Sequence, residues 1–177
     1  MTRRHVAFAM ALSTAALVPS LACAVAAQPA LLGSFKNWSA YETGSGDAKV
    51  CYALSRPTQS EPAKIKRDPP FFLLNDWPAR HAKAEPEIVP GFQYKDGSSV
   101  TAQLGADTVS FFTKNDGGAG GAWVEAQSDE ERLVNAMKTA SEAVVTGTSK
   151  RGTAVRDTYS LAGFADALDK AHQACGL

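Results

Sequence analysis

This chain has few residues suited to metal binding or to nucleophilic catalysis. Its 177 residues include three cysteines and three histidines. Neither type occurs in pairs at the spacing of a metal site, and no Asp/Asn-rich calcium loop is present. The serine nucleophile motif G-x-S-x-G is also missing. We therefore expect no metal site, no cofactor and no catalytic residue.

The chain also lacks an excess of either charge. It contains 18 Lys and Arg residues and 18 Asp and Glu residues, so its formal net charge is zero. Nucleic-acid-binding proteins usually carry a basic patch or stripe, and the sequence has none. We expect no nucleic-acid partner.

The apolar run at residues 6–18 is too short to span a membrane, because a spanning helix needs roughly 20 apolar residues. It follows Arg3 and Arg4 and precedes small residues at 24–27. A basic start, a short apolar core and an A-x-A-like exit are typical of a secretory signal peptide. We predict a signal peptide over residues 1–27, cleaved near Ala26–Gln28, and no transmembrane segment in the mature chain. The expected location is the periplasm, the medium or the outer membrane surface.

Removing the leader leaves about 150 residues, which is the usual size of one domain. We predict a single domain over residues 28–177, with 16 basic and 18 acidic residues. A lipid on Cys23 is an alternative fate for the N-terminus. Lipoprotein signals place Leu three residues before the modified cysteine, whereas Leu21 is two residues before Cys23. We favour removal of Cys23 with the leader.

The mature chain consists mainly of short β-type segments separated by turns. Residues 100–104 alternate apolar and polar side chains, as a half-buried strand does. Even spacing of such segments is typical of a sandwich or barrel. The glycine-rich stretch 115–121 lacks the Gly-Lys-Ser/Thr of a phosphate-binding loop and is interpreted as a hairpin. The predicted strands are 35–41, 49–54, 71–74, 88–94, 99–104, 108–113, 122–125, 143–146 and 153–161.

Two helices are expected in the second half of the chain. Ser128 and Glu131 have the spacing of a capping box at a helix N-terminus, and an apolar face follows at helical spacing up to residue 140. The last helix is predicted over residues 163–174, with Gly176 as its stop. Cys175 falls on the buried side of this helix.

Cys51 and Cys175 are the two cysteines left after leader removal, and an oxidising compartment favours a disulfide. A bridge between them would close a loop of more than a hundred residues and add up to about 5 kcal/mol in the chain-entropy model. Two buried free thiols, or an intermolecular bond, are the alternatives.

The best candidate for partner binding is the basic turn that contains Lys150 and Arg151, with Arg156 further along the next strand. Such a cluster favours an anion or an acidic partner. The alternative is a solvated hairpin turn in which Gly152 supplies a positive φ. Carboxylate pairs such as Glu85 with Glu87 would share one face of an extended segment, and could serve a hydrolase if a cleft brought two acids together.

Several stretches resemble the invasion associated locus B family, and the resemblance covers the whole mature chain. Its most specific part is the stretch D-T-Y-S-L-x-G-F together with the terminal cysteine. The residues that carry it are Trp38, Cys51-Tyr52, Pro90-Gly91-Phe92 with Gly97-Ser98, and a tail made of 133–137, 147–153, 157–164 and 167–175.

The resemblance implies an immunoglobulin-like β-sandwich with one or two added helices, the last at the C-terminus. It also implies a secreted or periplasmic protein of a Gram-negative bacterium, with a bridge between Cys51 and Cys175 and no catalytic residues to carry over. Members from pathogens are linked with entry into host cells. We therefore expect a non-enzymatic binding domain of the cell envelope whose partner is an envelope or host-cell protein. A small periplasmic hydrolase acting on cell-wall or sugar material is the alternative.

Overall fold

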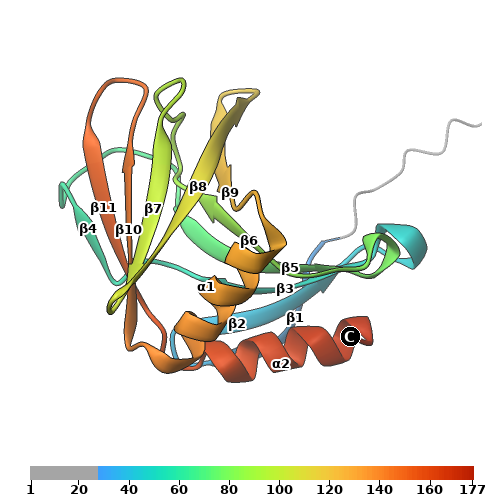
Figure 1. Cartoon of the computed structure of the whole chain (residues 1–177). Helices are drawn as coiled ribbons and strands as arrows, with labels where there is room; N and C mark the ends of the chain where they lie inside the picture. Colours follow the sequence, from blue (N-terminus) through green and yellow to red (C-terminus); the bar gives the residue numbers. More distant parts are fainter. Residues whose placement is uncertain (1–27) are drawn as a thin grey trace, which may run out of the picture.

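The computed structural model describes residues 28–177 (Figure 1). The predicted signal peptide, its cleavage site and Cys23 lie outside the described residues. Neither helix in the described part of the chain has both the length and the apolar character needed to cross a bilayer.

The described chain forms one antiparallel sheet of eleven strands, joined edge to edge in the order β1-β2-β3-β5-β6-β9-β8-β7-β10-β11-β4. The fold is therefore mainly β, as the sequence predicts, with two added helices. Two short 3₁₀ turns, η1 (Gly46–Ala48) and η2 (Pro78–Arg80), interrupt the strands. The strands are β1 (Ala30–Phe35), β2 (Trp38–Thr43), β3 (Val50–Ser55), β4 (Gln59–Glu61), β5 (Phe71–Trp77), β6 (Ala82–Val89), β7 (Ser99–Leu104), β8 (Asp107–Asp116), β9 (Ala119–Trp123), β10 (Glu142–Thr148) and β11 (Ala154–Ser160).

The sheet curls so that its two halves face each other like the layers of a sandwich (Figure 1). Phe72 on β5 lies edge-on to Phe111 on β8, at 6.3 Å between ring centroids, and to Tyr159 on β11, at 5.5 Å. Phe72 and Leu74 are buried, whereas Phe71 and Leu73 are half-buried. This alternation is what a strand with one core-facing side requires.

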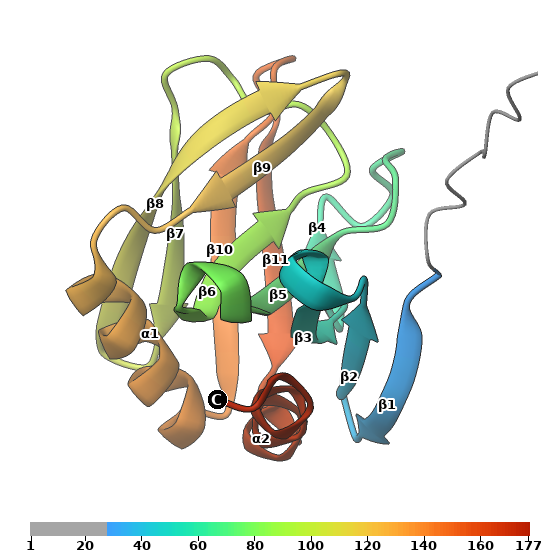
Figure 2. The same cartoon turned by 90° about the vertical axis from the view of Figure 1, so that its right-hand side faces the viewer.

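The C-terminal helix α2 (Phe164–Cys175) covers the inner face of β1, β2 and β3, and Figure 2 views it nearly end-on. Gly163 precedes it with φ 88, and a Cβ there would overlap the carbonyl oxygen of Phe35, so this position requires glycine. Phe164 and Leu168 are fully buried, and Gly176 ends the helix in a left-handed conformation. The predicted helix and its stop are confirmed.

A disulfide joins Cys51 on β3 to Cys175 at the end of α2. Beside it, the Lys49 ammonium group donates to the carbonyl oxygen of Ala174 at 2.6 Å. The predicted intramolecular pairing is therefore confirmed, and it fastens the last helix to an early strand.

The first helix, α1, runs over Gln127–Thr139 and lies beside β6 and β8. The predicted capping box is wrong. The Ala126 carbonyl accepts the amides of Asp129 and Glu130, so Ser128 lies within the first turn rather than at the cap. Glu131 accepts a hydrogen bond from the Gln127 side chain instead.

Two predicted strand positions are also wrong. Residues 35–41 contain a hairpin turn, because Lys36 adopts φ 53 and Phe35 pairs with Trp38. Strand β6 begins at Ala82 and ends at Val89, earlier than the predicted 88–94. The hairpin turn at Lys36 and Asn37 contains neither the Gly nor the Pro by which turns are recognised in sequence.

Candidate functional site

The turn between β10 and β11 borders a groove of about 410 Å³ that we call the basic groove. Three cationic side chains line it, those of Lys66, Lys150 and Arg151, and no carboxylate does. Lys150 is fixed by two contacts with Gln93: its amide donates to the Gln93 carbonyl at 2.7 Å and its ammonium to the Gln93 amide oxygen at 3.3 Å. The other lining residues are Ile65, Phe92, Gly118, Ser149 and Thr153.

The local sequence explains why the two turn cations project from the sheet. Gly152 adopts φ 85, and its amide donates to the Ser149 carbonyl at 2.8 Å, which closes a tight turn. The Ser149 hydroxyl accepts the Thr153 amide. Lys150 and Arg151 therefore sit at the exposed tip of the hairpin.

Arg156 does not line the basic groove. It pairs in register with Thr146 and with Glu61 on β4, and these residues border a neighbouring groove of about 320 Å³. Of the three cations singled out in the sequence, the structure brings together Lys150 and Arg151 and adds Lys66, which sequence reasoning missed.

A buried ion pair holds the segment that carries Lys66. The Arg67 guanidinium donates to both carboxylate oxygens of Asp157 on β11, and also to the Pro90 carbonyl and the Ser60 hydroxyl. The side chains of Arg67 and Asp157 are only 4% and 6% exposed. This pair ties the chain between β4 and β5 to the sheet and so positions one wall of the groove.

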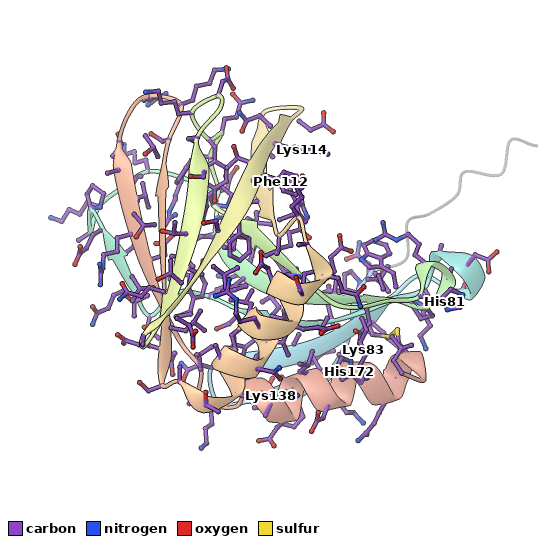
Figure 3. All side chains as sticks on the ribbon, viewed as in Figure 1. His81, Lys83, Phe112, Lys114, Lys138 and His172 are labelled. Atoms are coloured by element: carbon purple, nitrogen blue, oxygen red, sulfur yellow. A yellow bond between two sulfur atoms is a disulfide. The ribbon has the colours of Figure 1, made fainter. Side chains whose placement is uncertain are left out.

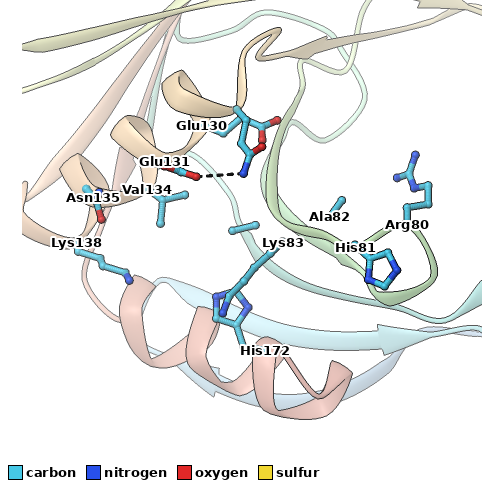
Figure 4. A pocket seen from close by; sticks show the side chains of 12 residues that line it. Arg80, His81, Ala82, Lys83, Glu130, Glu131, Val134, Asn135, Lys138 and His172 are labelled. Atoms are coloured by element: carbon cyan, nitrogen blue, oxygen red, sulfur yellow. Dashed lines mark hydrogen bonds between the residues drawn. The ribbon is translucent and has the colours of Figure 1, made fainter.

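A second hollow, of about 590 Å³, lies between α1, α2 and the start of β6, and we call it the helix cleft (Figures 3 and 4). Its base is formed by His172 on α2, whose Nδ1 lies 2.7 Å from a carboxylate oxygen of Asp76. Asp76 is fully buried, and its other oxygen accepts the Ala84 amide at 2.8 Å. Spacing in the sequence did not indicate that residues from these three distant segments meet here.

The strand β6 bulges where it borders the helix cleft. Trp77 pairs with Ala82 and Asn75 with Glu85, so two residues of β6 stand opposite the single residue Asp76. Ala84 in this bulge adopts φ 55, which is uncommon for a residue with a side chain. Bulges re-aim side chains next to functional sites, and this one carries Lys83 to the cleft wall.

The helix cleft contains both signs of charge. Lys83 and Lys138 form no ion pair with any carboxylate in residues 28–177. On the wall made by the start of α1, burial raises the pKa of Glu130, and the carboxylates of Glu85 and Glu131 raise it further. Within residues 28–177, no three His, Cys, Asp or Glu side chains are placed to hold a metal ion.

Glu85 and Glu87 share the outward face of β6, as the alternation predicts. Burial raises the pKa of Glu87, and the nearby Glu85 raises it further, whereas the hydrogen bond from Asn75 lowers it. A raised pKa means that the folded state binds the proton more tightly than the unfolded state. The contribution of Glu87 to stability is therefore complete below its ordinary pKa and is lost as pH rises through the raised value.

We expect Glu87→Gln to stabilise the protein at neutral pH by about 0.5 kcal/mol, a small value because the site is partly solvated. The gain should vanish below about pH 4, where both side chains are uncharged. Urea unfolding at pH 4 and pH 7 measures both values. Glu142→Gln, which removes the same charge from an exposed position on β10, is the matched control and should give no gain at pH 7. An equal gain at both pH values would contradict the assignment.

The protein belongs by its fold to the class of sandwich-like β domains, and a disulfide fastens its C-terminal helix to an early strand. A family model described as "Invasion associated locus B (IalB) protein" matches residues 38–172. The chain belongs to this family.

Among solved structures, the chain is similar to the crystal structure of invasion associated protein B from Bartonella henselae, with a TM-score of 0.55 and 14% sequence identity. The match covers 80% of this chain and 95% of the other. At this identity the likeness shows the fold alone, which agrees with the predicted sandwich. No curated protein matches the chain.

Proposed function

We propose that this protein is an exported, non-enzymatic member of the cell envelope that binds an acidic segment of another envelope protein or of a host-cell protein. The observation that carries the proposal is the basic groove, in which three cations meet and no carboxylate neutralises them. The family name, which refers to invasion, supports a role at the surface between bacterium and host.

The groove has the properties of a docking site for an acidic side chain or a short acidic stretch. Arg151 and Lys66 have no ion-pair partner in residues 28–177, so their charges are available to a ligand. Phe92 and Ile65 add apolar surface to the groove. Charge complementarity of this kind raises association rates and selects partners.

Export is supported by the disulfide between Cys51 and Cys175, because such bonds persist in oxidising compartments and are rare in the cytosol. The leader-like segment at residues 1–27 supports the same location. The mature protein would then begin near Gln28 and act in the periplasm, on the outer membrane or outside the cell.

The test is binding of labelled mature protein to outer-membrane vesicles and to intact host cells. We expect the double variant Lys150→Gln/Arg151→Gln to lose about tenfold or more in affinity, corresponding to about 1.4 kcal/mol. Binding by the native protein should weaken as salt is added, because exposed charges are screened.

The control is Lys36→Gln/Lys114→Gln, which removes the same charge from two exposed lysines outside both the basic groove and the helix cleft. It should bind like the native protein. Equal loss in the two double variants would mean that net charge, not the groove, governs binding, and would refute the proposal.

The hydrolase alternative receives less support from the arrangement of carboxylates. Glu130 and Glu131 are consecutive on α1, so they project about 100° apart around the helix axis rather than across one bond. A glycosidase needs two carboxylates facing each other from opposite sides of the scissile bond.

A further inference from the structure

We propose that the helix cleft is a binding site for a short peptide with free ends, in which Lys83, Lys138 and His172 hold the C-terminal carboxylate and Glu130 and Glu131 hold the N-terminal ammonium. This site is separate from the basic groove and does not depend on the function proposed for it.

The base of the cleft is held rigidly for a small ligand. Asp76 is fully buried and receives two hydrogen bonds, one from His172 and one from the amide of Ala84. Because Nδ1 of His172 is engaged with Asp76, Nε2 is the polar ring atom left to meet a ligand. One aspartate thus fixes both the ring of His172 and the bulge that carries Lys83.

The two lysines supply charge that nothing in the described chain neutralises. Lys83 comes from the bulge of β6 and Lys138 from the last turn of α1, and both line the cleft with His172 (Figure 4). A carboxylate is the ligand group that suits two ammonium groups and an imidazole, because each of them can donate a hydrogen bond to it.

The opposite end of the cleft has the reverse polarity. Glu130 and Glu131 lie in the first turns of α1, at the upper end of the cleft in Figure 4, and the Gln127 amide donates to Glu131. An ammonium group placed there would stabilise the charged form of Glu130, whose pKa is raised by burial and, to a smaller extent, by the carboxylates of Glu85 and Glu131. A primary amine at the peptide N-terminus supplies that group.

The helix itself sets the length of the ligand. Glu131 and Lys138 are seven residues apart, so they lie on the same face of α1 and about 10 Å apart along its axis. An extended chain advances about 3.3–3.6 Å per residue, so about three residues span this distance. The cleft volume of about 590 Å³ falls within the usual range for small-ligand pockets.

Calorimetry with the mature, disulfide-bonded protein tests the proposal, using trialanine as the probe. We expect saturable binding with a Kd below about 1 mM. N-acetyl-trialanine lacks the ammonium group and trialanine amide lacks the carboxylate, and each should bind at least about tenfold more weakly. Equal binding of all three, or no saturable binding of trialanine, would overturn the proposal.

Variants connect each end of the peptide to its residues. Lys138→Gln should weaken the binding of trialanine about tenfold and leave the already weak binding of trialanine amide unchanged. Glu131→Gln should also weaken the binding of trialanine about tenfold, and it should leave the already weak binding of N-acetyl-trialanine unchanged. Lys114→Gln, which removes the same charge far from the cleft, should bind trialanine like the native protein. If acetate competes as strongly as trialanine, the site binds anions only and the peptide assignment is wrong.

Discussion

Replacing Arg67 by Met should lower the free energy of unfolding by about 3–5 kcal/mol, because it leaves the carboxylate of Asp157 buried without a cation. The guanidinium makes a two-pronged contact with Asp157, and the Ser60 hydroxyl donates to the same carboxylate at 2.6 Å. The Arg67 cation also lies 5.7 Å from the ring centroid of Phe92. None of these contacts can be replaced by water, since both charged side chains are almost fully buried.

A double variant separates the destabilisation caused by an unpaired buried charge from the net stabilisation that the ion pair provides. Arg67→Met combined with Asp157→Asn removes both charges and keeps an acceptor for Ser60, so its loss should be clearly smaller than that of Arg67→Met alone. Arg132→Met is the control: its partner Asp129 is about half exposed, and the expected loss is below about 1 kcal/mol. Urea unfolding monitored by tryptophan fluorescence measures all three. Equal losses for the single and the double variant would contradict the interpretation.

The same substitution should affect partner binding. Arg67 anchors the segment that brings Ile65 and Lys66 to the basic groove. Without Arg67, the segment that forms this wall of the basic groove loses its anchor even while the protein remains folded. We therefore expect Arg67→Met to weaken binding to vesicles and cells under conditions where circular dichroism shows a native spectrum.

Sequence patterns identified the elements whose signals are local. The apolar stripe and the flanking glycine located α2, and strict alternation located β7, whose observed bounds coincide with the predicted ones. Errors arose where the deciding contact is tertiary or where a residue adopts an unusual backbone angle. The hairpin at Lys36 is an example of the second cause.

The alternation also contained a signal for both buried aspartates, although it could not name their partners. Asp76 continues the inward series of Phe72 and Leu74 on β5, and Asp157 lies between the inward residues Val155 and Tyr159 on β11. A carboxylate on the core side of a strand needs a cation or several donors. The partner of Asp157 comes from a loop 90 residues away and that of Asp76 from α2, 96 residues away, distances over which spacing carries no information.

Removing the disulfide should cost up to about 5 kcal/mol, since the bridge closes a loop with a sequence separation of 124 residues and the chain-entropy model gives about that value for such a loop. The double variant Cys51→Ala/Cys175→Ala is preferred to serine, because Cys51 is fully buried and a hydroxyl there would lack a partner. Urea unfolding of the variant against the oxidised native protein measures the difference, and native protein kept in dithiothreitol should lose a similar amount.

Removing the disulfide should also weaken ligand binding in the helix cleft. Cys51 pairs in register with Asp76, and His172 lies less than one turn before Cys175. The bridge therefore restrains both members of the contact at the base of the cleft. The folded double cysteine variant should bind trialanine more weakly than the native protein does. Its binding to vesicles through the distant basic groove should be unchanged. A loss of stability below about 1 kcal/mol in the double cysteine variant would contradict the first expectation. It would mean that Phe164, Leu168 and the contact from Lys49 already hold α2 in place. It would also mean that the unfolded chain is too compact for closure of the loop to change its entropy much.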